Sequence, residues 1–175
     1  KWTPEGRKEM YEQGAAATKR FMEFEKNLNI LIDRRQWDAA LKVTTEMEKD
    51  TNKSLAREGR LLRVSILQQS GKTSEALELC DSLVTNSNDW DVASEVAKML
   101  ASPLFPKPDL PRATMAALRA ISLSKKHEAL AYVALAEVQM RGGQRDLAIL
   151  SLDKSLLLAD RDEIDLIQNR LAEIR

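Results

Sequence analysis

The sequence predicts an all-helical protein built from repeated helical hairpins. Apolar residues recur at the three- and four-residue spacing of helices along most of the chain. Six glycines, two tyrosines and three phenylalanines in 175 residues are few for a β-protein, in which turns and aromatic residues are frequent. A small residue opens a helix at Ala40, Ala76 and Ala148, at intervals of 36 and 72 residues. A period of about 35 residues is typical of stacked helical hairpins.

The first hairpin is predicted over residues 18–50. Nearer the N-terminus, Thr3-Pro4-Glu5 indicates a helix start, because it offers a hydroxyl cap, a proline in the first turn and an acid near the positive end of the helix dipole. The polar residues Arg34-Arg35-Gln36 then separate two helices. The apolar face of the first helix is formed by Phe21, Phe24, Leu28 and Leu31, and that of the second by Trp37, Ala40, Leu41, Thr44 and Met47.

Three further hairpins are predicted over residues 54–87, 89–125 and 127–160. The second and fourth have tight glycine turns at Ser70-Gly71-Lys72 and Gly142-Gly143. The third has the sequence SPLFPKPDLP between its helices, where four prolines forbid regular helix and predict a longer extended loop.

A last helix is predicted over residues 161–175, where apolar residues again share one face. We expect this helix to cap the fourth hairpin, because the terminal units of repeat proteins need a polar outer side. The expected architecture is therefore a single domain over residues 1–175, a right-handed solenoid of about four hairpins with a C-terminal capping helix. The stripe of the capping helix consists of Ile164, Ile167, Leu171 and Ile174.

Two parts of the chain resemble the second-helix half of tetratricopeptide repeats. They are Gly71, Ala76, Cys80 and Leu83, and Gly143, Ala148, Leu152 and Ser155. The first helices lack the Trp and Gly of that family, and Leu28, Val64 and Ala136 hold the small-residue position. The resemblance implies a repeat fold and leaves the type of peptide binding open.

A second resemblance covers most of the chain. DVASEVAKMLASPLFPKPDLPRATMAALRAISLS, followed by EALAYVALAEVQMRGGQRDLAILSLDKSLLLA, is similar to the helical region after a redoxin (thioredoxin-like) domain in bacterial thiol–disulfide oxidoreductase-type proteins. KWTPE looks like the segment where such a domain ends. The chain has no CxxC motif, so the resemblance implies a non-catalytic C-terminal appendage, a partner in its own upstream thioredoxin-like domain, and an exported or periplasmic location.

The composition argues against two classes of function, nucleic-acid binding and membrane spanning. The 27 basic and 27 acidic residues balance, whereas a module that neutralises phosphates has a basic excess, so we expect no nucleic-acid partner. No apolar run approaches the ~20 residues of a membrane span. The chain begins at Lys1, so we expect it to be an excised part of a longer protein, and its own residues leave the compartment open.

Few residues could carry chemistry. Cys80 is the only cysteine and His127 the only histidine. Cys80 shares the inward face of its helix, so we expect a buried structural thiol and no nucleophile. His127 is expected at a helix start near the surface. No carboxylate loop has the spacing of a calcium site, so the sequence predicts no catalytic residue, metal or cofactor. The sequence does not decide whether Trp90 is buried or exposed.

The expected function is a non-catalytic protein-interaction or scaffold module that binds a protein or peptide. First helices line the concave side of such solenoids, and the 36- and 72-residue offsets place nine residues on one stripe there. An RNA-binding helical array and a structural spacer whose concave face binds nothing tightly are the alternatives. A second candidate surface is the proline loop at Leu104 and Phe105. The predicted stripe consists of Glu25, Asn29, Asp33, Leu61, Ser65, Gln69, Val133, Glu137 and Arg141.

Overall fold

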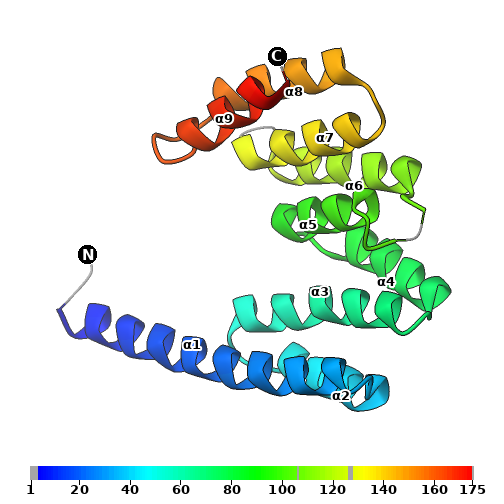
Figure 1. Cartoon of the computed structure of the whole chain (residues 1–175). Coiled ribbons are helices and arrows are strands. Elements are labelled where there is room, and N and C mark those ends of the chain that lie inside the picture. The colour runs from blue at the N-terminus through cyan, green and yellow to red at the C-terminus, as the bar shows by residue number, and fades with distance from the viewer. Residues whose placement is uncertain (1–3, 106, 126–127, 175) are drawn as a thin grey trace. The chain divides into compact units, whose positions relative to one another are not determined.

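The computed structural model describes residues 4–105, 107–125 and 128–174, with side chains described from Gly14 onward. All regular structure in these residues is helical, which confirms the all-α class (Figure 1). Contacts divide the chain into two compact units, Lys1–Lys72 with three helices and Thr73–Arg175 with six. The helices are α1 (Pro4–Asp33), α2 (Trp37–Glu48), α3 (Lys53–Gln69), α4 (Thr73–Asn86), α5 (Trp90–Ala101), α6 (Leu110–Leu123), α7 (Ala129–Arg141), α8 (Arg145–Leu156) and α9 (Ile164–Ile174).

An apolar cluster packs α1, α2 and α3 of the first unit together. The Arg20 guanidinium on α1 donates two hydrogen bonds, of 3.0 and 3.1 Å, to the Asp50 carboxylate after α2. Helices α2 and α3 approach closely at Gly59, where a Cβ atom would lie only 2.7 Å from the Cβ of Met47. The buried cluster consists of Leu28, Ala40, Val43, Met47, Leu55 and Ile66.

Three helices end in the same backbone turn. Arg35, Gly71 and Gly143 have left-handed φ values of 54°, 80° and 72°. In each turn the next residue's N–H donates to the carbonyl five residues earlier, as in the Schellman motif. The three bonds are Gln36 to Leu31 at 2.8 Å, Lys72 to Leu67 at 2.9 Å and Gln144 to Gln139 at 2.8 Å.

The small residues that predicted the repeat are fully buried. Ala40, Ala76 and Ala148 each have 0% of their surface exposed. An alanine at these positions keeps a helix close to its neighbours, because no larger side chain separates them. The repeated sequence pattern therefore corresponds to a repeated local structure, which is a turn followed by a helix with a buried alanine.

A loop separates α5 from α6, as predicted, and its described residues, 102–105 and 107–109, include turns and bends. The Asp109 N–H donates to the Leu100 carbonyl at 3.0 Å and closes the loop. The Asp109 carboxylate then caps α6 by accepting from the Arg112 N–H at 3.1 Å. Phe105 is 2% exposed, so this ring lies in the core and the prediction of a surface contact is wrong there. Leu104 is half-buried.

The second unit is organised around α7, which packs against α5, α6 and α8 (Figure 1). Because neighbours surround it, this helix buries residues on several faces rather than on one stripe. Most of the apolar stripe predicted for the last helix is buried: Ile167, Leu171 and Ile174 on α9 pack in one cluster with residues of α7 and α8. Ile164 is half-buried.

The described helix bounds agree with the helices predicted for the four hairpins. The prediction that these helices pair as four hairpins is not decided by the bounds. Helix α3 belongs to the first unit and α4 to the second. The predicted hairpin over residues 54–87 therefore spans the boundary between the units. The single domain and the continuous solenoid stay predictions. Thr3 and His127 lie outside the described residues.

Candidate functional site

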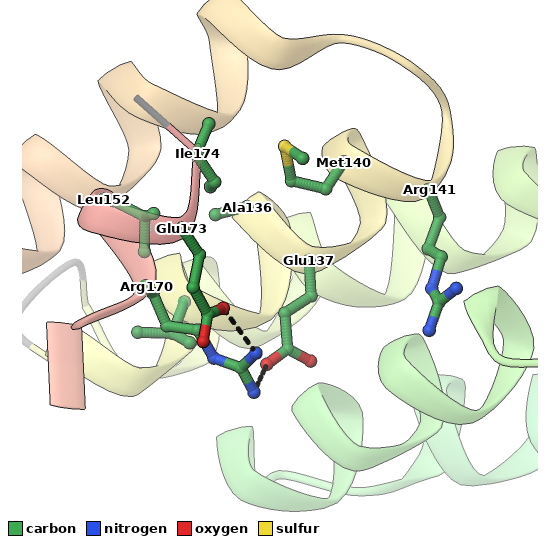
Figure 2. A pocket seen from close by; sticks show the side chains of 9 residues that line it. Ala136, Glu137, Met140, Arg141, Leu152, Arg170, Glu173 and Ile174 are labelled. Carbon is green, nitrogen blue, oxygen red and sulfur yellow. Dashed lines mark hydrogen bonds and ion pairs between the residues drawn. The ribbon is translucent and has the colours of Figure 1, made fainter.

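A cavity of about 430 Å³ lies between α7, α8 and α9 in the second unit (Figure 2). One face of α7 contributes five residues at helical spacing, α9 contributes three and α8 one. The lining consists of Val133, Ala136, Glu137, Met140, Arg141, Leu152, Arg170, Glu173 and Ile174.

The floor of this cavity is apolar. Val133, Ala136, Leu152 and Ile174 are all at most 8% exposed, so they form a fixed surface that belongs to the core of the unit. Met140 is 38% exposed, and its unbranched thioether side chain adapts easily to a bound surface. The floor therefore offers apolar contact without a rearrangement of the backbone.

The rim carries charge, and most of it is already paired. The Arg170 guanidinium lies 3.5 Å from the Glu137 carboxylate and 3.3 Å from that of Glu173. Figure 2 shows the two carboxylates converging on this guanidinium from α7 and α9. Ion pairs between partly exposed side chains contribute little to stability. The cluster can therefore exchange partners with a bound molecule at small cost.

Arg141 differs from Arg170. It is exposed at the end of α7, and Figure 2 shows its guanidinium well away from the Arg170 cluster. Within the described part of the chain, no carboxylate forms an ion pair with it. This guanidinium is therefore available to an acidic group outside the chain.

A second cavity, of about 240 Å³, adjoins the first and shares Val133, Glu137 and Arg170 with it. Helix α5 adds Trp90 and Ser94 to its lining. Trp90 is half-buried and packs against the cluster between α5, α6 and α7, which settles the position that the sequence left open. Together the two cavities form a continuous lining across α5, α7 and α9.

The stripe residues of the second unit come together in this site. Val133, Glu137 and Arg141 all line the larger cavity. Val133 is buried, Glu137 is half-buried and Arg141 is exposed. Val133 therefore belongs to the core as well as to the cavity floor.

The cavities described in the first unit are lined by residues other than the predicted stripe. A hollow of about 490 Å³ between α1 and the start of α3 is lined by other residues, including Thr18, Phe21 and Leu55. Leu61 is only 8% exposed, so it is a core residue and not a contact residue. Ser65 is half-buried, and the remaining four are exposed, namely Glu25, Asn29, Asp33 and Gln69.

Cys80 is buried, as predicted, with 0% of its surface exposed. Burial, helped by the negative charge of Asp81, raises the pKa of its thiol to about 12, and the Arg112 charge offsets this only in part. Thiolate is the nucleophilic form of cysteine, so this thiol stays protonated and unreactive at neutral pH.

In residues 4–105, 107–125 and 128–174, no cluster of three or more histidine, cysteine or acidic side chains has the arrangement of a metal site. The same ranges contain no helix with the length and apolar character needed to cross a bilayer.

Most lining residues of the two cavities were not predicted as contact residues, and the polar side chains of Ser94, Arg170 and Glu173 are among them. Arg170 and Glu173 lie one turn apart beside the apolar stripe of α9, where polar residues are ordinary and carry no signal. Ser94 lies among alanine and valine on α5 and looks like a small core residue. An ion pair between α7 and α9 follows only from the tertiary structure.

Comparison of the chain with protein-family models, with curated proteins and with solved structures gives no match.

Proposed function

We propose that this chain is a non-catalytic protein-interaction module whose contact surface is the larger cavity between α7, α8 and α9. One observation carries the proposal. A fixed apolar floor lies beside a rim in which Arg141 has no ionic partner among the described residues and Arg170 is held by weak, exchangeable pairs. Such a combination of buried apolar area and polar rim is typical of protein-binding surfaces.

The partner that we propose first is the thioredoxin-like domain that the sequence resemblance implies upstream of Lys1. The module would then position that domain or its substrate. The buried thiol of Cys80 supports a role outside the redox chemistry itself, because a thiol with a pKa of about 12 is a poor nucleophile.

The test is charge reversal on the rim, with matched reversals elsewhere in the second unit. Glu137→Arg and Arg141→Glu are the test variants. Glu78→Arg and Arg161→Glu, at exposed positions outside both cavities, are the controls. The thioredoxin-like domain is titrated into each variant, and affinity is measured by calorimetry.

We expect at least one rim reversal to weaken binding tenfold or more, about 1.4 kcal/mol, with the controls unchanged. Arg141→Glu and the two controls should keep wild-type stability within ~0.5 kcal/mol, because surface substitutions usually do. Glu137→Arg sets a second guanidinium beside Arg170, so its fold is checked by circular dichroism before the titration. Folded rim variants that bind as tightly as wild type would place the contact surface elsewhere, and half-buried Leu104 would be the next site to test.

We also propose that the hairpins continue as one tetratricopeptide-like, right-handed solenoid. The identical turns at Arg35, Gly71 and Gly143 support this, because equal turns at multiples of 36 residues repeat one local geometry. Residual dipolar couplings test it. A rigid solenoid gives one alignment tensor for both units, whereas two unrelated tensors would contradict the proposal.

A further inference from the structure

The lining of the larger cavity includes two guanidinium groups, and they differ in how they are paired. Arg170 is held between Glu137 and Glu173. Arg141 is exposed at the end of α7, and no carboxylate in the described residues forms an ion pair with it. A carboxylate of a partner can therefore pair with Arg141 without displacing a group of the chain itself.

Accessible apolar surface lies next to Arg141. Met140 precedes it on α7 and is 38% exposed, while Val133 and Ile174 keep 7% and 8% of their surface accessible. In the view of Figure 2, Met140 lies between Ile174 and Arg141. A volume of about 430 Å³ has room for one large apolar side chain and is too small for a helix. An apolar residue that covers Met140 would thus place its sequence neighbour within reach of Arg141.

The remaining charges limit how many acids the cavity accepts. Glu137 and Glu173 share the single guanidinium of Arg170, so these three groups together carry two negative charges and one positive charge. A second carboxylate placed beside them would be repelled. With Arg141 included, the lining has two cations and two carboxylates, so its net charge does not oppose one acid. The lining therefore favours a single acid at Arg141 over a pair of acids.

We propose that the larger cavity binds a segment of the protein partner in which a large apolar residue adjoins a single acidic residue. The apolar side chain packs on Met140, Val133 and Ile174, and the side-chain carboxylate pairs with Arg141. A guanidinium can donate two parallel hydrogen bonds to a carboxylate, and the thioether chain of methionine adapts to the shape of the group that covers it. The inference rests on the proposed function, because it specifies the chemistry of the partner at the same surface.

The first experiment uses blocked dipeptides, so it does not depend on knowing the partner. The chain is titrated with N-acetyl-leucyl-aspartate amide, and the shifts of the Met140 methyl group and the Arg141 amide are followed by NMR. The leucyl-asparagine analogue has nearly the same shape without the charge. The alanyl-aspartate analogue lacks most of the apolar side chain, and the aspartyl-aspartate analogue has a second acid in its place.

We expect leucyl-aspartate to bind about threefold more tightly than leucyl-asparagine, a small ratio because exposed ion pairs are weak. It should bind about fivefold more tightly than alanyl-aspartate, because leucine buries more apolar surface. Aspartyl-aspartate should bind more weakly still, because its second acid meets Glu137 and Glu173. Sodium chloride at about 1 M should abolish the difference between aspartate and asparagine, because salt screens exposed charges.

Two variants of the cavity test the assignment, each with a matched control. Arg141→Gln removes the charge and should weaken leucyl-aspartate about threefold, to the affinity of leucyl-asparagine, and Arg141→Lys should restore part of the loss. Met140→Ala should weaken both leucyl probes equally, because it removes apolar contact. Arg161→Gln and Met115→Ala, at exposed positions outside both cavities, should leave the affinities unchanged. Circular dichroism confirms the fold of each variant before the titration.

Equal binding of leucyl-aspartate and leucyl-asparagine, tighter binding of aspartyl-aspartate, or the absence of shifts with every probe would overturn the proposal. So would leucyl-aspartate binding that Arg141→Gln leaves unchanged. The titration of the thioredoxin-like domain separates these results from a failure of the proposed function. If Arg141→Glu weakens binding of that domain while the two leucyl probes bind equally, only the assignment of an acidic segment is refuted. If the probes bind as expected while the rim reversals leave binding of the domain unchanged, the cavity takes this segment from another protein and the proposed partner is wrong.

Discussion

The close approach of α2 and α3 makes Gly59 the position where one added methyl group has the sharpest effect. A Cβ on Gly59 would lie 2.7 Å from Met47 Cβ, 2.9 Å from the Glu48 nitrogen and 3.0 Å from the Thr44 carbonyl oxygen. Two of these atoms belong to the backbone and the third is a Cβ, so no rotation of a side chain relieves the overlap. Carbon atoms in good contact are about 3.5–4.0 Å apart, so the helices would have to separate by roughly 0.8 Å.

Two effects oppose each other in Gly59→Ala. Alanine favours a helix over glycine by about 1 kcal/mol. Overpacking typically lowers the free energy of unfolding by ~1–3 kcal/mol. A change that forces two helix backbones apart falls at the upper end of this range. Because the separation also loosens the buried cluster around Met47 and Ile66, we expect a net destabilisation of about 2 kcal/mol.

Gly14→Ala is the matched control, since Gly14 lies inside α1 and an added Cβ meets nothing within 4 Å. It should stabilise by about 0.5–1 kcal/mol through helix propensity alone. Urea denaturation followed by circular dichroism, with hydrogen exchange of α2 and α3, measures both. If Gly59→Ala stabilises as much as Gly14→Ala, α2 and α3 do not approach as closely as described, and the reasoning fails.

Three further expectations concern the turns, the thiol and the last helix. Arg35→Gly should stabilise by about 1 kcal/mol and Gly71→Ala destabilise by a similar amount, because a left-handed φ costs residues other than glycine ~1–2 kcal/mol; unchanged urea midpoints would contradict this. Cys80 should react slowly with a thiol reagent until the protein is denatured, and rapid labelling of the native protein would refute this. The buried, protonated thiol contributes fully to the free energy of unfolding below pH 9. This contribution should disappear as the pH rises toward the native pKa of about 12. Removal of residues 161–175 should cause aggregation or a lower melting temperature, and an unchanged melting curve of a monomeric truncation would show that α9 is peripheral.

Much of the fold could be predicted because its signals are local. Glycine and proline change the backbone where they stand, so the turn at Gly71 and the loop before α6 follow from neighbouring residues alone. The buried alanines follow from spacing. At Arg35, however, an arginine adopts the left-handed φ usually taken by glycine. The break between the helices was predicted there from the polar residues Arg34-Arg35-Gln36, but the left-handed φ of Arg35 was not predicted.

The contact surface was harder to predict because exposure depends on neighbours in space. Equal offsets along the chain treat every first helix alike, yet Glu25 is exposed while Leu61 and Val133 are buried. Helix α7 packs against three other helices in its unit, so the same helical position becomes part of a core there. The importance of Gly59 and of Arg170 likewise depends on which atoms of other helices lie opposite, and no spacing rule reports that.

The pairing of helices has a consequence for how the chain folds. Within each unit, the helices that pack closely are neighbours in sequence or next neighbours, such as α5 with α6 and α5 with α7. Each contact therefore closes a short loop, and the entropy lost before it forms is small. Helical proteins with such local contacts fold in about microseconds to milliseconds. Each unit should therefore fold as soon as its own helices have been synthesised, without waiting for a distant part of the chain.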